Sequence, residues 1–138
     1  MAEKLREVWE HLVSHQVTRA LDGWVNSFAV DGVMEWPFRL KGVPPRLEGQ
    51  QAIRAALEPV WERAKQSNRR ITGHERVVFH ETQDPEVAIV EFDMVGETAR
   101  GPFRQAMVYL LRVRNGRVLL LREFVDTAAL SELFQVSS

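Results

Sequence analysis

The chain has 138 residues, of which 45% are hydrophobic and 27% charged, so it is predicted to form one domain over residues 1–138. Its 18 basic and 19 acidic side chains give a net charge of −1, which argues against binding nucleic acid or an anionic membrane through bulk charge. The absence of cysteine excludes disulfides and a thiol nucleophile. No apolar run is long enough to span a membrane, and the charged N-terminus is unlike a secretory signal, so a cytoplasmic protein is expected.

The first half of the chain has mostly helical periodicity. Residues 4–14 carry apolar side chains at i, i+3, i+4 and i+7, which predicts an amphipathic helix. A second apolar stripe comprises Val17, Leu21, Trp24, Val25 and Phe28. The two stripes predict either one helix with a bend near residues 14–15 or two helices, stopped by the Asp-Gly pair at 31–32. Residues 50–66 are again helical in spacing, and Pro59 is expected to kink or split that helix.

Strand-like patterns dominate the second half. A short strand is predicted over residues 33–36, followed by a loop over 39–49 that is rich in Pro and Gly. Beyond residue 70 the period changes, and strands are predicted over 71–81, 87–96, 103–114 and 117–126. A short helix is expected over 128–135. Helices followed by an antiparallel meander indicate an α+β fold, with the N-terminal helices packed on a curved, mainly antiparallel sheet.

Apolar residues are dense in the last strands of this predicted sheet. They are Phe103, Val108, Leu110, Leu111, Leu119, Leu120 and Leu121. Such density exceeds what one buried face requires, so the second face is expected to be covered by another subunit in a homodimer.

Three stretches carry a resemblance to a known family: FAVDGVMEWPF (28–38), RLEGQQAIRAAL (46–57) and LLRVRNGRVLLLREFVD (110–126). In this order they resemble the NTF2-like superfamily, and within it the SnoaL-like group of polyketide cyclases and relatives of ketosteroid isomerase. The resemblance implies a cone-shaped fold, in which a bent sheet wraps helices around an apolar pocket. Related enzymes place one or two acids or bases in that pocket, as the ketosteroid isomerases do with an Asp base and oxyanion donors.

The resemblance places particular residues at the pocket positions. Trp36 stands where the ketosteroid isomerases carry their base, and Glu35 is expected on the opposite face of the strand. Tyr109 stands at the oxyanion Asp position, so the isomerase mechanism does not transfer to this chain. The stretch Arg122-Glu123-Phe124 resembles the phenazine-ring-forming members, in which this Glu is a pocket acid/base. The His that those members carry on the third helix has no counterpart here.

Glu123 is therefore the predicted general acid/base, and Tyr109 the predicted donor to a substrate oxygen. The competing interpretations are a surface salt bridge for Glu123 and an ordinary core position for Tyr109. The predicted lining of the pocket consists of Trp24, Phe28, Met34, Trp36, Phe92, Gln105 and Met107. Plain core packing is the alternative for the apolar members, and a position at the sheet edge is the alternative for Gln105.

The register of the last hairpin decides whether Glu123 faces the pocket, since a slip of one residue turns a side chain to the other face. A two-residue turn at 115–116 would pair Arg114 with Arg117. A three-residue turn with a glycine bulge would pair Val113 with Arg117 and set Glu123 beside Tyr109. We expect the second arrangement, because like charges at 114 and 117 disfavour direct pairing.

Three functions fit these features. The first is a cofactor-independent cyclase, isomerase or dehydratase acting on a polyketide-like, terpenoid or aromatic metabolite. The second is a non-catalytic protein that binds a small apolar or aromatic ligand, and the third a dimeric adaptor. We expect the first. No metal is expected. His11 and His15 lie at i, i+4 on a helix, a spacing that a metal site can use, but a solvated helix face is the preferred explanation for them.

Overall fold

The structure, a computed structural model, describes residues 2–38 and 42–131. Its elements in chain order are α1 (Ala2–Thr18), α2 (Leu21–Asn26), β1 (Phe28–Glu35), β2 (Arg46–Glu48), α3 (Gln50–Gln66), β3 (Arg70–Glu81), β4 (Val87–Thr98), β5 (Gly101–Arg114) and β6 (Arg117–Val125). Residues 127–131 form a further helical turn, and the rest of the helix predicted over 128–135 lies outside the described residues.

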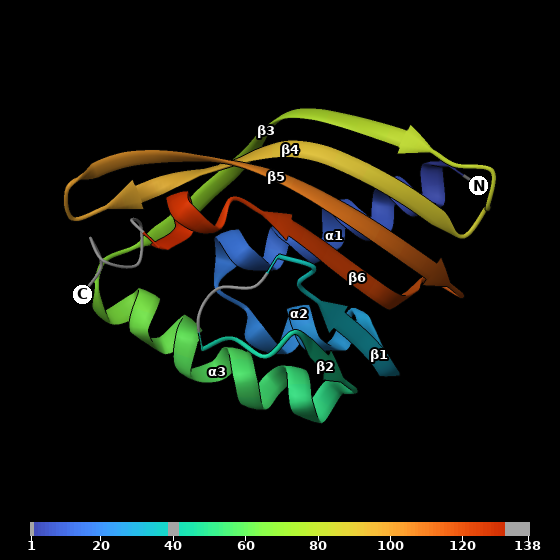
Figure 1. Cartoon of the computed structure of the whole chain (residues 1–138), viewed down its shortest axis with the longest axis horizontal. Coiled ribbons are helices and arrows are strands. Elements are labelled where there is room, and N and C mark those ends of the chain that lie inside the picture. Colours follow the sequence, from blue (N-terminus) through green and yellow to red (C-terminus); the bar gives the residue numbers. More distant parts are fainter. Residues whose placement is uncertain (1, 39–41, 132–138) are drawn as a thin grey trace.

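A six-stranded sheet forms the main layer, in the order β2-β1-β6-β5-β4-β3. Neighbouring strands are antiparallel except β1 and β6, which run parallel. Figure 1 shows the long strands β3 to β6 arching over the helices, which lie on the concave side. This arrangement confirms the predicted α+β fold and its curved, mainly antiparallel sheet.

The strands predicted beyond residue 70 agree with β3 to β6 within two residues, but the first strand was predicted too short. β1 begins at Phe28, where helical spacing had been expected to continue, and it includes the Asp-Gly pair at 31–32. A Cβ atom on Gly32 would lie 2.7 Å from the carbonyl oxygen of Val118 in β6. The register between β1 and β6 also shifts between Phe28 and Val33. The glycine therefore permits a close approach at a strand irregularity and does not end a helix.

The helices differ from the prediction in two places. α1 continues through residues 14–15, and the chain breaks between α1 and α2, where Arg19 has a φ of 57°. α3 runs without interruption through Pro59, so the predicted split does not occur. Pro59 is exposed, and water can therefore reach the carbonyl that loses its helical partner. β2 lies inside the stretch predicted as a loop.

The last hairpin has neither of the two predicted registers along its whole length. Arg114 pairs with Arg117 across a two-residue turn, in which Asn115 and Gly116 both have positive φ, so the expected three-residue turn is wrong. Repulsion between the two arginines is relieved, because Arg114 binds Glu86 and Arg117 donates to the carbonyl of Asn26.

A shift of register then follows within this hairpin. Val113 pairs with Val118 while Arg112 pairs with Leu120, which leaves one extra residue on β6. Tyr109 consequently lies directly opposite Glu123. The expectation that these two side chains share a face is confirmed, but a bulge produces the arrangement and the turn does not.

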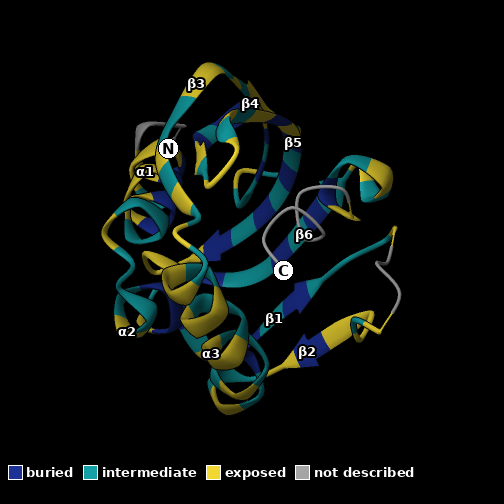
Figure 2. Ribbon diagram, turned by 90° about the vertical axis from the view of Figure 1, so that its left-hand side faces the viewer, coloured by how far each residue is buried: buried dark blue, intermediate teal, exposed yellow. Residues whose placement is uncertain are grey.

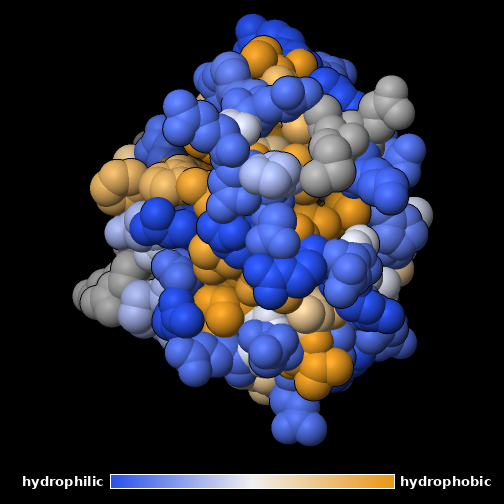
Figure 3. Space-filling model, turned by 90° about the vertical axis from the view of Figure 1, so that its right-hand side faces the viewer, coloured by the Kyte–Doolittle hydropathy of each residue, from blue (hydrophilic) through white to orange (hydrophobic). Residues whose placement is uncertain are grey.

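The two faces of the sheet differ in character. The inner face packs against α1 and contains the core, and buried residues follow the long strands and the inward side of the helices (Figure 2). The outer face carries partly exposed apolar side chains among charged ones, with Val78 49% exposed. On the side of the molecule shown in Figure 3, apolar atoms also reach the surface in separate patches between hydrophilic groups.

Candidate functional site

A buried carboxyl group lies at the centre of the candidate site. Glu123 is 8% exposed and faces the concave side of the sheet. The indole Nε1 of Trp36 donates a hydrogen bond to its Oε1 over 2.8 Å. Tyr109, which is fully buried, lies directly opposite Glu123 across β5 and β6, and its hydroxyl acts as a donor to this carboxyl. Sequence analysis named all three residues, and the fold brings them together.

The sheet explains why these side chains meet. β1 runs parallel to β6 with Glu35 beside Arg122, so the next residue along β1, Trp36, lies beside Glu123. The backbone N–H of Trp36 donates to the carbonyl of Pro45 over 3.0 Å, which anchors the chain after β1. An aromatic residue that cannot act as a base thus supplies a hydrogen-bond donor to the buried carboxyl.

Burial dominates the electrostatics of this group. Removal from water raises the pKa of Glu123 above its ordinary value, while the hydrogen bonds from Tyr109 and Trp36 lower it in part. Burial, and then the nearby Glu123 carboxylate, raise the pKa of Tyr109 well above 10. Among the described residues Glu123 has no ion-pair partner, so the salt bridge considered as its alternative does not form. A carboxyl with a raised pKa can both accept and return a proton near neutral pH.

Two further polar residues reach Tyr109 from the opposite side. Gln16 of α1 lies with its Nε2 3.4 Å from the Tyr109 hydroxyl, and its Oε1 lies 2.8 Å from Nε2 of His74 in β3. The sequence analysis missed Gln16. A signal was present, because Gln16 continues the apolar stripe of Trp9, Leu12 and Val13 and is a polar residue on the face of α1 that enters the core.

The predicted lining residues fall into two groups. Phe92 packs edge-on against Tyr109, with ring centroids 4.9 Å apart, and pairs with Met107 across β4 and β5. Gln105 and Met107 share the inner face of β5 with Tyr109, and both are 5% exposed. Met34 lies beside Leu121, two positions before Glu123. Phe92, Met107 and Met34 thus adjoin the neighbours of the carboxyl, whereas Gln105 lies four positions from Tyr109 along β5.

Trp24 and Phe28 lie elsewhere in the core. Phe28 pairs with Val118, five positions before Glu123, or about 16 Å along an extended strand. Trp24 packs against Phe28 and, edge-on, against Trp61 of α3. Both residues are almost fully buried in this cluster, so the structure supplies a packing role for them, and contact with a ligand stays a prediction.

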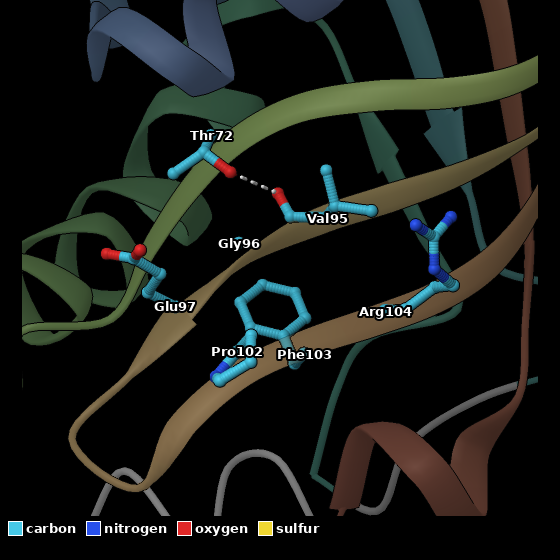
Figure 4. A pocket seen from close by; sticks show the side chains of 7 residues that line it. All are labelled: Thr72, Val95, Gly96, Glu97, Pro102, Phe103 and Arg104. Carbon is cyan, nitrogen blue, oxygen red and sulfur yellow. Dashed lines mark hydrogen bonds between the residues drawn. The ribbon is translucent and has the colours of Figure 1, made fainter.

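Glu35 points to the other face, as predicted, and forms ion pairs with Arg46 and Arg122. Two surface hollows lined by described residues lie away from Glu123. One is formed by β3, β4 and β5, where Phe103 lies against Gly96, at which a Cβ atom would collide with the backbone of Arg70 (Figure 4). The other lies between the end of α1 and the start of β3.

His11 and His15 lie side by side on α1, with their Nε2 atoms 3.4 Å apart. Within the described part of the chain, no group of three or more His, Asp or Glu side chains converges in a way that would hold a metal ion. No helix among the described residues is long and apolar enough to cross a membrane.

Comparison with known proteins agrees with this architecture. Residues 5–120 match the model of the SnoaL-like domain. The chain belongs to the SnoaL-like family. It is 36% identical to the uncharacterised PhzA/B-like protein PA3332 of Pseudomonas aeruginosa over 104 residues, which are 74% of this chain and 70% of that protein.

Solved structures place this SnoaL-like chain among NTF2-like folds. A putative isomerase from Bacillus subtilis superposes with a TM-score of 0.83 and 22% identity, covering 97% of this chain and 94% of the other. A phenazine biosynthesis-related protein from Pseudomonas aeruginosa superposes with a TM-score of 0.71 and 19% identity, covering 98% and 83%. At these identities the likeness concerns the fold, and function has to be argued from the site.

Proposed function

We propose that this SnoaL-like protein is a cofactor-independent enzyme of the cyclase, isomerase or dehydratase type, with Glu123 as its general acid/base. The observation that carries the proposal is a buried carboxyl held by two neutral donors, Trp36 and Tyr109, on the concave side of the sheet. A structural carboxyl would be expected to have an arginine or lysine partner when buried this deeply. An acid/base group needs the opposite arrangement, because a cation would hold it permanently ionised.

The proposed chemistry is proton transfer next to a carbonyl group. The Glu123 carboxylate removes a proton from the carbon beside the carbonyl of a polyketide-like, terpenoid or aromatic metabolite, and the C–H electron pair becomes the enolate. The enolate then takes the same proton back at another carbon, attacks a second carbonyl of the same molecule to close a ring, or expels a hydroxyl group. In each case the carboxylic acid formed on Glu123 supplies the proton that completes the step.

The aromatic and sulfur-containing side chains near the carboxyl favour a flat, apolar substrate. Phe92, Met107 and the Trp36 ring supply the apolar surface, and Gln105 supplies one buried amide. Tyr109 already bonds to Glu123, so its first role in the proposal is to stabilise the carboxylate. Donation from Tyr109 to a substrate oxygen stays a prediction.

A proton-exchange assay tests the proposal without knowledge of the natural substrate. The aromatic ketone 2-tetralone serves as the probe, and NMR follows deuterium uptake at its α-carbons in deuterated buffer. Wild-type protein is expected to accelerate uptake, Glu123→Gln to abolish the acceleration, and the exposed Glu81→Gln to behave as wild type. Equal rates in wild type and Glu123→Gln would reject the acid/base role.

The second candidate is a ligand-binding protein without catalysis. The complete burial of Tyr109 favours it, because a hydroxyl bonded within the protein needs no substrate oxygen. This candidate predicts that 2-tetralone quenches tryptophan fluorescence equally in wild type and Glu123→Gln, with no exchange in either.

A homodimer formed through the outer face of the sheet accompanies the proposed function. Val78, Val108 and Leu110 leave apolar surface on that face, and Val78 is 49% exposed. Around them lie acidic and basic groups in pairs, such as Asp93 with Arg76 and Arg104. A face with balanced charges can meet its own copy across a two-fold axis without net repulsion.

A further inference from the structure

A line of polar side chains connects a half-buried histidine to the buried carboxyl. It runs from His74 in β3 through Gln16 in α1 and Tyr109 in β5 to Glu123 in β6. The first contact spans 2.8 Å and the second 3.4 Å. Trp36 approaches Glu123 from the other side. Residues far apart in the sequence thus form one continuous chain of hydrogen bonds through the core.

The chemistry of an ionised carboxylate fixes the direction of every bond in this line. A carboxylate only accepts, so the Tyr109 hydroxyl has to donate to Glu123. The Tyr109 oxygen is then free to accept from the Gln16 amide nitrogen, which turns the amide oxygen toward His74. Nε2 of His74 therefore has to carry the ring hydrogen. Amide orientation and ring tautomer both follow from the charge on Glu123.

Protonation of Glu123 permits the reverse order. The carboxyl can then donate to Tyr109, Tyr109 can donate to the oxygen of Gln16 once the amide has turned over, and the amide nitrogen can donate to a bare Nε2 of His74. In the orientation shown, the Gln16 amide nitrogen donates to Tyr109, which leaves the Tyr109 hydrogen for Glu123. This orientation is the one that fits the ionised form of Glu123, and losing the donation from Gln16 weakens Tyr109 as a donor to the carboxylate.

We infer that Gln16 and His74 are positioning residues that hold the Tyr109 hydroxyl hydrogen on Glu123, and that the tautomer of His74 is coupled to the charge of Glu123. The catalytic meaning of this coupling rests on the proposed function, but the coupling itself exists without substrate. Its effect in catalysis is to keep Glu123 ionised and ready as a base.

No charged group interferes with this line among the described residues. The titratable side chains that face Glu123 are Tyr109 directly and His74 through Gln16. Strand alternation puts Asp93 and its arginines on the outer face, where they form ion pairs. The charged residues near the C-terminal half of α3 are exposed, namely Glu58, Glu62, Arg63 and Lys65. Burial lowers the pKa of His74 to about 4, so its ring is neutral near pH 7 and only its tautomer can vary.

Nitrogen NMR of histidine-labelled wild-type protein tests the inference first. The spectrum of His74→Phe identifies the His74 signals by their loss. Near pH 7 the His74 ring is expected to carry its hydrogen on Nε2, and a ring with its hydrogen on Nδ1 while Glu123 is ionised would overturn the inference. The tautomer is measured on the wild-type protein, and His74→Phe serves only to assign the signals.

A pair of matched variants provides the second test. Gln16→Met removes the amide but keeps a flexible side chain of similar length, and the pKa of Glu123 is expected to rise further above its wild-type value. Gln105→Met removes another buried amide, which donates to the carbonyl of Ala106, and the titration of Glu123 is expected to stay unchanged. NMR of isotope-labelled glutamate carboxyls measures both, with Glu123→Gln to assign the signal.

The two proposals fail in distinguishable ways. If Gln16→Met titrates as wild type, the positioning role is wrong, whereas the exchange assay still judges Glu123 as acid/base. If Glu123→Gln retains full exchange activity, the proposed function is wrong, whereas the coupling between His74 and Glu123 is still measured by the tautomer.

Discussion

Two carboxyl groups on opposite faces of the same sheet expose similarly little surface to solvent, and their pKa values shift in opposite directions. Asp93 and Glu123 are each 8% exposed. Asp93 accepts hydrogen bonds from Arg76 and Arg104, and these bonds hold its pKa below the ordinary value. Among the described residues, the donors to Glu123 are the neutral groups of Tyr109 and Trp36, and burial raises its pKa. Burial alone therefore does not decide what a carboxyl does, because the charge of its donors does.

The comparison assigns the two groups to different tasks. Asp93 joins Arg76 of β3 and Arg104 of β5 across β4, which ties three strands together on the outer face. Among the described residues, Glu123 forms no ion pairs of this kind. Its removal from water opposes folding once the carboxyl is ionised. A group that weakens the fold in this way is retained for what it does chemically.

The largest expected contrast lies in proton exchange. Glu123→Gln is expected to reduce the exchange of 2-tetralone by about 10²- to 10⁴-fold, the range typical of a lost general acid/base. Asp93→Asn is expected to lower the free energy of unfolding and to leave exchange unchanged, because it removes the partner of two arginines on the far face. If Asp93→Asn folds fully but loses exchange activity, the two faces do not differ in the way proposed.

Trp36→Phe tests how one neutral donor affects the pKa of Glu123. The ring is kept, but the indole N–H is removed, so the pKa of Glu123 is expected to rise further. Unfolding in urea near neutral pH should show a loss of about 1–3 kcal/mol, the range for a buried polar group that loses a partner. A carboxyl whose pKa is raised in the folded state destabilises that state as the pH rises and the proton is lost. The loss of stability in Trp36→Phe should therefore be smaller at pH 4 than at pH 8. An equal loss at both values would show that only packing has changed.

His74→Phe tests the acid side of the same network. Burial lowers the folded-state pKa of His74 from 6.5 to about 4, so the unfolded chain binds more protons between these values. Wild-type stability is therefore expected to fall as pH drops from 6.5 toward 4. The half-buried ring is partly screened by water, and its share of this loss is about 1–2 kcal/mol. In urea titrations, the stability of His74→Phe should fall less than that of wild type between pH 6.5 and pH 4. The stability of His80→Phe should fall as in wild type.

The smallest expected change in fold stability belongs to the outer face. Leu110→Gln places a polar group in the middle of the proposed dimer surface, so light scattering should show a fall from twice 15.9 kDa to 15.9 kDa. The inward-facing core is untouched, and the circular dichroism spectrum should stay that of wild type. A wild-type protein that is already monomeric would contradict the dimer.

Much of the fold was predictable because its signals are local. Alternation and turn residues located β3 to β6 within two residues, since each strand repeats the same pattern over many positions. The first strand was misplaced, because Phe28 continues a helical stripe in sequence but pairs with Val118 in space. Only the tertiary pairing of β1 with β6 could decide between the two.

The candidate site was predictable in its residues and not in its connections. Glu123, Tyr109 and Trp36 could be named from the sequence, but the bulge that sets Tyr109 opposite Glu123 depends on one extra residue in β6. Gln16 and His74 could not be joined to them, because their contacts link segments 58 and 93 positions apart. A polar residue on an apolar helix stripe, such as Gln16, is the sequence signal that indicates a buried long-range polar contact.

A carboxyl titration of the ligand-free protein tests the central claim most directly. NMR of protein labelled at the Glu and Asp carboxyl carbons follows Glu123 and Asp93 in one sample, with Glu123→Gln and Asp93→Asn to assign them. Glu123 is expected to titrate above the ordinary glutamate value and Asp93 below the ordinary aspartate value. If Glu123 titrates at or below the ordinary value, the buried carboxyl is a permanent anion, and its role as a proton-transfer group is contradicted.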